Sequence, residues 1–394
     1  MVLKNRKILL GVTGSVAVHK AVDLARRLTE EGASVHVVMT DAAKKFVAPL
    51  SFEVASQKKV HADLFADPMS HLALTADADI FVVAPASANS IGKFAGGIAD
   101  DLLSTCMLSV TGKVLLAPAM NWRMYENRVL QKNLQFLASQ GMLQVGPERG
   151  SLACGEDAIG RMADVPEILE AIRSALSKKD LSGRKILVTA GPTREHLDPV
   201  RFLSNRSSGK MGFAIAKAAI RRGAAVTLVS GPAHIKPPAH ARFIGVETAA
   251  AMREAIFGNL DGCAALIMTA AVADFSPVRR EDKKLDKSDG LMLNLQRTPD
   301  ILAEIGAMNR RPLLVGFSAE TGSDLSRSQR KLREKGADVM VFNNVESPGS
   351  GFDVDTNEIT ILEGDSVTAL PLMTKDEAAE ALLDRVSHLF LDFS

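Results

Sequence analysis

Residues 185–223 read KILVTAGPTREHLDPVRFLSNRSSGKMGFAIAKAAIRRG, and this stretch contains the pattern that decides the fold. An apolar run at 186–188 ends in Thr-Ala-Gly-Pro, and a long polar loop leads into a helix that ends at Gly223. A buried strand, a loop and a helix in this order form half of a βαβ unit. Ligands of open α/β sheets lie beyond the carboxyl ends of the strands. Because this loop is cationic and rich in amide donors, we expect it to bind a phosphorylated or carboxylated ligand.

The first part of the chain shows the same alternation. Apolar runs bounded by turn residues predict strands at residues 8–12, 34–40, 80–86, 113–119 and 143–145. Helical periodicity and end signals predict helices at 19–31, 90–110, 123–140 and 165–176. Residues 146–162 have no clear periodicity, which predicts a mobile flap. Strands that alternate with helices predict a parallel sheet with helices on both faces.

The second part of the chain repeats this logic after a polar linker at 177–183. Its predicted strands are 185–190, 225–230, 242–246, 264–270, 313–317 and 339–342, and its predicted helices are 208–222, 248–258, 299–308 and 322–336. A hairpin is expected at 358–362 and 367–370, followed by a last helix from residue 375. Single cores rarely grow past about 250–300 residues. We therefore expect two Rossmann-like α/β domains, 1–178 and 183–394, the second doubly wound with a β-hairpin extension.

Composition excludes several classes of protein. Lys and Arg number 47 against 46 Asp and Glu, a balance that argues against a nucleic-acid binder or a membrane-surface protein. Aromatic residues make up 5%, which leaves little for base stacking. Cys106, Cys154 and Cys263 are far apart and form no CxxC, so a disulfide framework is not indicated and a reducing cytoplasm is expected. No apolar run reaches about 18 residues, so no membrane span is predicted.

Two glycine-containing turns are candidate anion sites. Gly11-x-Thr-Gly-Ser15 stands where phosphate-binding turns stand, but Thr13 occupies the second glycine position of GxGxxG. A tight turn and a phosphate site therefore both remain open. Residues 207–212, SSGKMG, resemble the end of a P-loop. Ser204 replaces the required glycine and Met211 follows Lys210, so a looser amide-and-lysine anion site is the alternative.

Three further candidates also have an ordinary structural interpretation. A free cysteine such as Cys154 is most often a small buried hydrophobe. Its small and polar neighbours also suit a proton donor, because a thiol with a pKa near 8.5 is mostly protonated at neutral pH. His71 is a lone histidine, which is usually structural. The run Lys283-Lys284-Leu-Asp-Lys287 is either a solvated loop or a lysine loop that closes over a triphosphate.

Taken together, these residues resemble the bifunctional phosphopantothenoylcysteine decarboxylase/phosphopantothenate–cysteine ligase family of bacterial coenzyme A synthesis, over nearly the whole chain. The first half carries the motifs His71-Leu-x-Leu74, Pro85-Ala-Ser-Ala-Asn89, Gly97-Ile-Ala-Asp-Asp-Leu102, Pro118-Ala-Met-Asn121, Ala153-Cys-Gly155 and Gly160-Arg-Met162. The second half carries Ala190-Gly-Pro-Thr-Arg194, Asp198-Pro-Val-Arg201, Ser207-Ser-Gly-Lys-Met-Gly212, Ala270-Ala-Val-Ala-Asp274 and Gly316-Phe317. The resemblance implies a flavodoxin-like flavoprotein domain followed by a ligase domain.

For the decarboxylase half, the resemblance implies FMN as the cofactor. The residues expected to contact FMN are Thr13, Gly14, Ser15, Thr40, Ser87 and Asn89. Cys154 matches the family's proton donor, and Asn121 matches the residue that grips the substrate carboxylate. His71 matches an essential histidine beside the flavin.

For the ligase half, the resemblance implies activation of 4′-phosphopantothenate by CTP to an acyl-cytidylate, followed by attack of L-cysteine. Asn205 matches the asparagine that turns over the acyl-cytidylate, and Arg201 is expected to hold a carboxylate or phosphate. The expected nucleotide residues are Ala270, Asp274, Lys284, Thr298, Pro299, Phe317, Lys331 and Lys335. Lysines and Mg²⁺ are the expected stabilisers of phosphate charge, with no metal ligand assigned.

The resemblance also implies a cytoplasmic homo-oligomer, in which trimeric decarboxylase units are joined through ligase dimers into a dodecamer. Two positions depart from the family pattern. Asp286 stands in a loop that usually reads Lys-x-Lys-Lys, and Asn344 stands where aspartate is usual. Two competing hypotheses follow: a decarboxylase whose ligase half has decayed, supported only by Asp286, and a non-catalytic nucleotide sensor.

We expect Cys154→Ser to block the last step of decarboxylation but not the release of CO₂. A serine hydroxyl has a pKa far above the value of about 8.5 of a thiol and is a poor proton donor. Analysis of the products formed from phosphopantothenoylcysteine should therefore find CO₂ and an oxidised ene-thiol. A normal yield of phosphopantetheine would refute the assignment.

Overall fold

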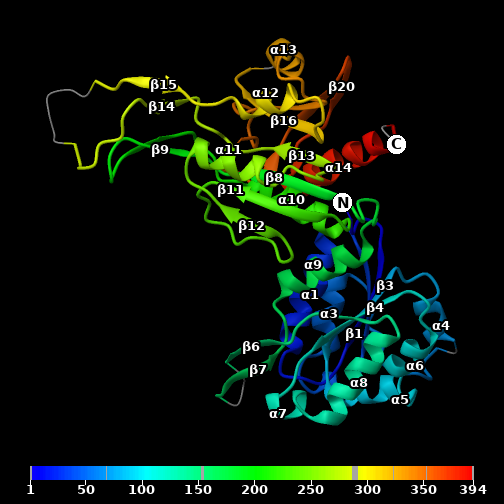
Figure 1. The fold of residues 1–394 in the computed structure, drawn as a ribbon. Helices are drawn as coiled ribbons and strands as arrows, with labels where there is room; N and C mark the ends of the chain where they lie inside the picture. Colours follow the sequence, from blue (N-terminus) through cyan, green and yellow to red (C-terminus); the bar gives the residue numbers. More distant parts are fainter. Residues whose placement is uncertain are drawn as a thin grey trace. The chain divides into compact units, whose positions relative to one another are not determined.

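The protein forms two compact units, Met1–Ser177 and Lys178–Ser394, in its computed structural model (Figure 1). The structure describes residues 2–67, 69–151, 155–285, 292–322, 324–351 and 353–392. Each unit has its own sheet and its own hydrophobic core, so each is described by itself. Within these described ranges, no helix is long and apolar enough to cross a membrane.

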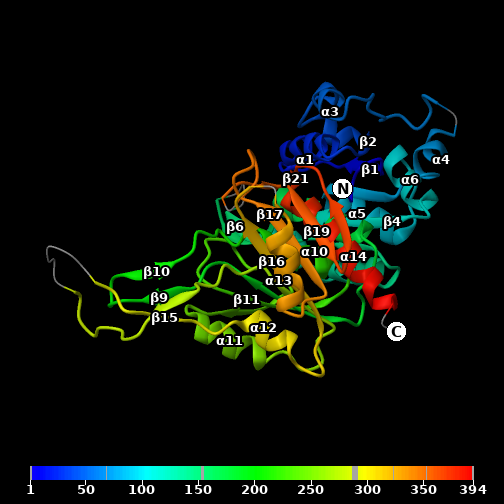
Figure 2. The ribbon, with the colours of Figure 1, turned by 90° about the horizontal axis from the view of Figure 1, so that it is seen from above.

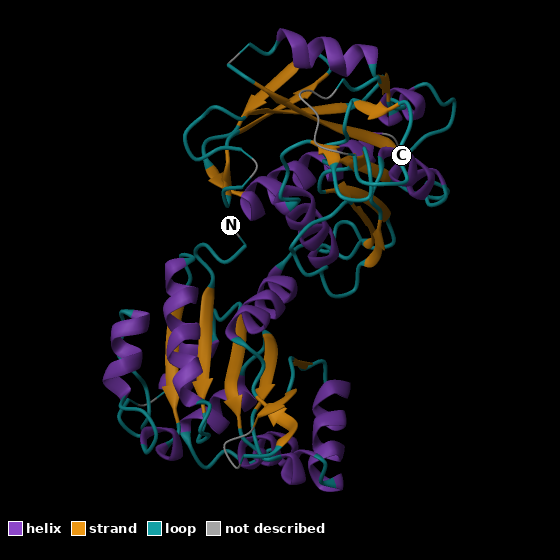
Figure 3. Ribbon diagram, turned by 90° about the vertical axis from the view of Figure 1, so that its left-hand side faces the viewer, coloured by secondary structure: helices purple, strands orange, loops and turns teal. Residues whose placement is uncertain are grey.

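The first unit contains a five-stranded parallel sheet of order β2-β1-β3-β4-β5. The strands are β1 Lys7–Val12, β2 Ser34–Met39, β3 Ile80–Ala86, β4 Lys113–Pro118 and β5 Leu143–Gln144. Every residue of β3 is buried, as expected for a parallel strand covered on both faces. Helices lie on both faces of the sheet (Figure 3). This strand order is the flavodoxin-like order.

The helices of the first unit agree with the prediction at residues 18–30 and 165–176, and they are shorter and more numerous between them. They are α1 Val18–Glu30, α2 Asp41–Lys44, α3 Pro49–Ser56, α4 Ser70–Thr75, α5 Ala88–Gly96, α6 Leu102–Ser109, α7 Trp122–Tyr125, α8 Arg128–Ser139 and α9 Val165–Leu176. The single helix expected at 90–110 is divided because Gly97, with φ of 66°, ends α5 and Asp101 begins α6 with a capping box. The helix expected at 123–140 is likewise divided, since Asn127 caps a new helix.

The flap predicted at residues 146–162 contains regular structure, so the prediction of a segment without it was wrong. Strands β6 Glu148–Ser151 and β7 Asp157–Arg161 form an antiparallel pair. Gly160 has no room for a Cβ, which would lie 2.2 Å from the carbonyl oxygen of Met120. The hairpin therefore packs closely on the loop that contains Asn121. Cys154 lies outside the described residues.

The second unit contains an eight-stranded sheet of order β12-β11-β8-β13-β16-β17-β19-β20. Its strands are β8 Lys185–Ala190, β11 Ala225–Ser230, β12 Arg242–Gly245, β13 Ala265–Met268, β16 Leu313–Glu320, β17 Val339–Asn344, β19 Ile359–Glu363 and β20 Ser366–Ala369. The first six strands along the chain are parallel and lie in the order 3-2-1-4-5-6, and β19 and β20 add an antiparallel hairpin. The predicted fold class, with a Rossmann-type second domain and its hairpin extension, is confirmed.

The helices described in the second unit are α10 Lys210–Arg221, α11 Ala249–Phe257, α12 Ile301–Gly306, α13 Ser326–Glu334 and α14 Lys375–Asp392. Helices α10 and α14 pack against each other on one face of the sheet. Two buried arginines at the end of α10, Arg221 and Arg222, form ion pairs with acidic residues of α14. The last helix is therefore part of the core of this unit.

Short strand pairs interrupt loops that the sequence predicts to be irregular. They are β9 Arg194–His196 with β10 Phe202–Ser204, β14 Phe275–Pro277 with β15 Leu295–Arg297, and β18 Thr356–Asn357 with β21 Met373–Thr374. Strands β9 and β14 contact each other. Residues 194–204 and the described parts of 275–297 extend away from the sheet together, and we call them the arm (Figures 1 and 2).

We expect the two units to fold and act as separate fragments when the chain is cut after Ser177. We place the cut there so that Asp180 stays with the second unit, because it forms a bidentate ion pair with the buried Arg222, at 2.9 and 2.5 Å. By the resemblance, fragment 1–177 should be yellow and decarboxylating, and fragment 178–394 should be colourless and form the amide with CTP.

Calorimetry supplies a control for this prediction. A fragment that begins at Leu181 loses Asp180, so it should melt at a lower temperature than one that begins at Lys178. Fragments that are active only when mixed would contradict the division into two domains.

Candidate active sites

In the first unit, most of the predicted flavin residues follow the carboxyl ends of neighbouring strands. The order of the strands reverses between β1 and β3, which is where ligands of such sheets bind. Thr13 is buried between the two loops that leave this point. Its hydroxyl donates to the carbonyl oxygen of Pro85 at 2.7 Å and accepts from the backbone N–H of Ser87 at 2.9 Å. The hydroxyl of Thr13 therefore holds the two loops together.

The other predicted flavin residues are near helix starts at this edge. Ser87 caps α5 by accepting from the backbone N–H of Ser90 at 3.3 Å, and Asn89 is exposed in the first turn. Thr40 caps α2 in the same way, and Ser15 accepts from the N–H of Ala17. Gly14 is required, because a Cβ there would lie 2.6 Å from that of Ala42. Hydroxyls and free backbone N–H groups at one edge are a donor set that suits a phosphate.

Asn121 lies at the same edge, and His71 does not. Asn121 follows β4 and caps α7 by accepting from the N–H of Arg123 at 2.9 Å. The half-buried His71 lies on α4, and its carbonyl oxygen is 3.5 Å from the hydroxyl of Ser109, which precedes the amino end of β4. Its neighbour Ala73 accepts from Lys7 at the amino end of β1. The structure thus separates His71 from the flavin residues of its own chain.

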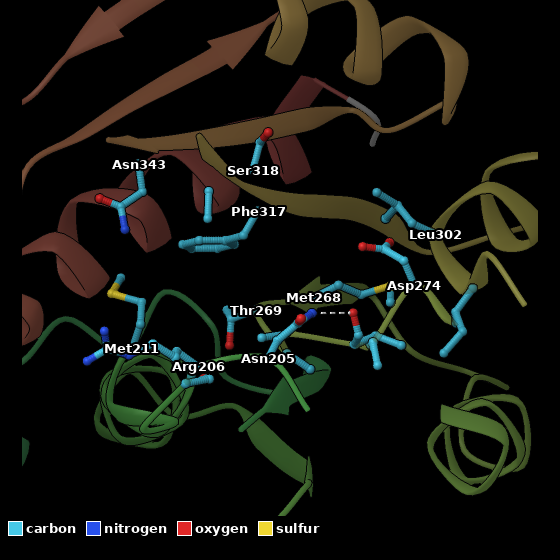
Figure 4. A pocket seen from close by; sticks show the side chains of 18 of the residues that line it. Asn205, Arg206, Met211, Met268, Thr269, Asp274, Leu302, Phe317, Ser318 and Asn343 are labelled. Carbon is cyan, nitrogen blue, oxygen red and sulfur yellow. Dashed lines mark hydrogen bonds between the residues drawn. The ribbon is translucent and has the colours of Figure 1, made fainter. Parts of the chain in front are cut away.

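The second unit has a pocket of about 980 Å³ at the carboxyl ends of β8, β13, β16 and β17 (Figure 4). It therefore lies across the point where the strand order reverses between β8 and β13. The predicted residues that line it are Asn205, Ala270, Asp274, Thr298, Pro299, Phe317, Lys331 and Lys335. Eight of the predicted ligase residues are thus brought together.

One wall of the pocket is the beginning of α10. Gly209, with φ of 79°, precedes the helix, and Lys210 is its first residue. Gly212 lies against the sheet, since a Cβ there would be 2.5 Å from Thr269 Oγ1 and 2.8 Å from the carbonyl oxygen of Thr189. This close approach is the role of the third glycine in dinucleotide-binding turns. The backbone N–H groups of the first turn of α10 favour an anion in the pocket.

Cations from α13 form a second wall. Lys331 Nζ lies 2.6 Å and Arg327 Nη1 lies 3.1 Å from the two carboxylate oxygens of Glu320. Burial is the largest single effect and opposes the charged form of Glu320, but the hydrogen bonds from Lys331 and Ser318 and the nearby positive charges together outweigh it, so the pKa of this carboxyl lies below its usual value. Lys335 forms an ion pair with Asp300. The carboxylates fix the cations in place before a ligand arrives.

A second group of cations meets at a loop that ends in β18. Lys210 Nζ donates to the carbonyl oxygen of Asp353 and to Asp355 Oδ1, both at 2.7 Å. Lys375, the first residue of α14, is buried and donates to the carbonyl oxygens of Gly351, at 2.9 Å, and Val354. Burial, followed by repulsion from Lys210, lowers the pKa of Lys375. These two lysines hold the loop against the pocket.

The side chains of Asn205 and Phe317 point into the pocket (Figure 4). Asn205 Nδ2 donates to the carbonyl oxygen of Val272 at 2.9 Å, which fixes the amide and leaves its second N–H for a ligand. The ring of Phe317 offers a flat apolar surface on which a nucleobase could stack. The pocket therefore combines anion-binding walls, an amide donor and an aromatic platform.

Two predicted ligase residues, Arg201 and Lys284, belong to the arm and do not line this pocket. Three cations that line the pocket were missed, Arg297, Arg327 and Lys375. Arg327 could have been found, since residues 327, 331 and 335 have the i, i+4 spacing of one helix face. Lys375 gives no such signal, because it is distant in sequence from every other pocket motif. In the described part of the chain, no group of three or more His, Cys, Asp or Glu residues could hold a metal ion.

Comparison with known proteins matches each unit to a family. Residues 2–177 match the family described as Flavoprotein, and residues 181–390 match the DNA/pantothenate metabolism flavoprotein C-terminal domain. The coenzyme A biosynthesis bifunctional protein CoaBC of Bacillus subtilis (strain 168) is 42% identical, with 98% of each chain covered. CoaBC of Escherichia coli (strain K12) is also 42% identical over 98% of each chain.

A solved C-terminal domain of a CoaBC protein is 41% identical and covers 55% of this chain and 100% of its own, with a TM-score of 0.48. The family matches define a two-domain flavoprotein enzyme. The chain belongs to the family of the bifunctional CoaBC proteins of coenzyme A biosynthesis.

We expect Gly212→Ala to destabilise the second unit by about 1–3 kcal/mol, the usual cost of overpacking. Gly245→Ala is the control, since a Cβ there meets nothing closer than 3.5 Å. Differential scanning calorimetry should show a lower melting temperature for the second unit in Gly212→Ala and no such change in Gly245→Ala. Equal shifts in the two variants would contradict the close packing of α10.

Proposed function

We propose that the protein makes 4′-phosphopantetheine in two steps. The second unit joins 4′-phosphopantothenate to L-cysteine with CTP, and the first unit decarboxylates the product with FMN. The family assignment supports the pair of activities. The observation that carries the ligase half is the pocket at the β8–β13 reversal, where Asn205, Phe317 and two groups of cations meet.

The pocket suits formation and breakdown of an acyl-cytidylate. In the first half-reaction, the substrate carboxylate attacks the α-phosphorus of CTP and pyrophosphate leaves. Lys331, Arg327 and the amino end of α10 stabilise the charge that develops on the phosphate oxygens. In the second half-reaction, the cysteine amine attacks the acyl carbon and CMP leaves. The free N–H of Asn205 then donates to the carbonyl oxygen that becomes negative.

In this proposal, Mg²⁺ binds to the protein together with the nucleotide. The ion keeps several waters and binds substrate phosphates with one or two carboxylates at most. The described residues offer no three-carboxylate site, and Asp274 is a pocket carboxylate that could complete such a complex. We therefore assign Mg²⁺ to the CTP complex and not to a site built by the protein alone.

The residues of the first unit fit FMN. The loops held by Thr13, together with the amino end of α5 at Ser87, supply hydroxyl and N–H donors for its phosphate. Bound FMN supplies the exchange of an electron pair with the thiol-bearing carbon of the substrate. Asn121 holds the substrate carboxylate until CO₂ leaves. The hairpin β6–β7 packs beside Asn121, and we propose that Cys154 donates a proton from the segment between these strands.

We also propose a cytoplasmic homo-oligomer in which sites are completed by neighbouring chains. Arg201 and Lys284 lie on the arm, outside the pocket of their own chain, and His71 lies away from the flavin residues. Exposed apolar side chains on the arm support pairing of two arms: Val200, Phe202, Phe275, Val278 and Leu295. A ligase dimer would bring the arm cations to the pocket of the second chain. Trimers of the first unit would bring His71 to a flavin.

The two departures from the family pattern weigh little against this proposal. Asn344 Oδ1 accepts from the backbone N–H of Glu346 at 3.1 Å, so it caps a turn, a role that asparagine fills well. Asp286 lies outside the described residues. In a ligase half that had lost its activity, we would not expect the cations of the pocket to remain paired and aligned.

One assay tests the function. The protein is incubated with CTP, phosphopantothenate and cysteine, and pyrophosphate and CO₂ are both measured. We expect pyrophosphate in a one-to-one ratio with the amide product. If added phosphopantothenoylcysteine yields CO₂ but no pyrophosphate is formed, the ligase half has decayed. If neither CO₂ nor pyrophosphate is formed, the protein is better explained as a nucleotide sensor.

We expect Asn205→Asp to let the acyl-cytidylate form and accumulate. The carboxylate cannot donate, so it loses the bond to Val272 and the N–H needed in the second half-reaction. Quenched reactions should contain the cytidylate when analysed by mass spectrometry. Asn259→Asp is the matched control, because this amide also donates to a backbone carbonyl, that of Ala255 at 2.8 Å, away from the pocket. Normal amide formation in Asn205→Asp, with no trapped cytidylate, would refute the role.

A further inference from the structure

Asp198 is a buried carboxylate in the arm for which the proposed mechanism has no role. No part of its side chain is exposed. It lies in the turn between β9 and β10, three residues before Arg201. A carboxylate removed from water needs hydrogen bonds or an ion pair to remain charged. Its partners therefore show what it holds in place.

One oxygen of Asp198 fixes the segment that contains Arg201. Oδ1 accepts from the backbone N–H groups of Val200 and Arg201, each at 2.7 Å. The turn is closed further by the backbone N–H of Leu197, which donates to the carbonyl oxygen of Arg201 at 2.9 Å. The Arg201 guanidinium lies on the side of the other oxygen, with Nη1 3.5 Å from Oδ2. Both the backbone and the side chain of Arg201 thus face Asp198.

The second oxygen of Asp198 reaches a segment more than eighty residues further along the chain. Oδ2 accepts from the backbone N–H of Leu285 at 3.1 Å, and Leu285 directly follows Lys284. The backbone N–H of Glu281 donates to the carbonyl oxygen of Leu197 at 2.9 Å and supports the same junction. Desolvation opposes the charge, but the N–H donors of Val200, Leu285 and Arg201 outweigh it. The pKa of Asp198 therefore lies below its usual value.

We propose that Asp198 is a positioning residue of the ligase, which holds Arg201 and the Lys284 segment together so that the arm presents both cations as one unit. The inference rests on the proposed function, in which these two cations act on the ligase substrates. An acceptor-only side chain is required here, because both oxygens face N–H donors. Glutamate is longer by one methylene and would not fit in the closed site.

The test compares two buried carboxylates of the same hairpin. In Asp198→Asn the amide oxygen can still accept from Val200 and Arg201, so the turn is kept. The new NH₂ then faces the N–H of Leu285 and the anchor of the lysine segment is lost. The control is Glu195→Gln. Glu195 is buried in β9 and accepts from the backbone N–H of Ala249 at 2.8 Å, and it does not touch the lysine segment.

We expect Asp198→Asn to raise the KM for CTP about tenfold, the effect of leaving one buried N–H without an acceptor. Decarboxylation by the same chains should be unchanged, and Glu195→Gln should stay within about twofold of the parent protein. Amide hydrogen exchange at Leu285 should be faster only in Asp198→Asn. This second measurement reports on the anchor even if the ligase activity of the variant is too low to measure.

Lys284→Ala separates the two ways in which the inference could fail. A parental KM in Asp198→Asn, together with a raised KM in Lys284→Ala, would overturn the role of Asp198 and leave the proposed function intact. A parental KM in Lys284→Ala would overturn the assignment of the arm cations, and the inference with it. Unchanged exchange at Leu285 in Asp198→Asn would overturn the anchor itself.

Discussion

Where two parallel strands lead into loops on opposite faces of a sheet, their last backbone groups lose their partners and must find others. Both units solve this problem with threonine hydroxyls. In the first unit, Thr13 bridges the loops after β1 and β3. In the second unit, Thr193 accepts from the backbone N–H of Ala273 at 3.0 Å, and Thr269 donates to the carbonyl oxygen of Thr189 at 2.6 Å. Each site lies beside loops that these hydroxyls hold together.

The pocket of the second unit depends equally on the last helix of the chain. Arg221 and Arg222 are 2% exposed and lie among acidic residues of α14, while Asp180 binds Arg222 from the other side. Buried charges of this kind are costly to separate, so α10 and α14 keep one relative position. The two helices begin at Lys210 and Lys375, and both of these lysines face the pocket. The ion pairs at the far end of α10 thus help to set the positions of cations at its near end.

The sequence predicted the sheets better than the connections. Short apolar runs such as 80–86, bounded by turn residues, are typical of buried parallel strands, so their positions were clear. The helix breaks at Gly97 and Asn127 follow from cap residues that also occur inside helices, and periodicity alone could not decide between the two. The β6–β7 hairpin was missed because Gly150 and Gly160 hide its alternation. Asn205, Phe317 and Lys331 meet in one pocket as the motifs predict, whereas Lys375 is brought there only by the packing of α14 on α10.

The charges of the pocket explain how it can attract a triphosphate without binding every anion tightly. Lys331 and Arg327 share Glu320, Lys335 has Asp300, and Lys210 has Asp355. These cations are aligned before the ligand arrives, so little reorganisation is needed during the reaction. A phosphate must nevertheless compete with a carboxylate at each of them. A single phosphate gains little from such an exchange, whereas a nucleotide that reaches the cations of α13, the start of α10 and the ring of Phe317 together gains from all of them. The paired carboxylates therefore favour a ligand long enough to span the pocket.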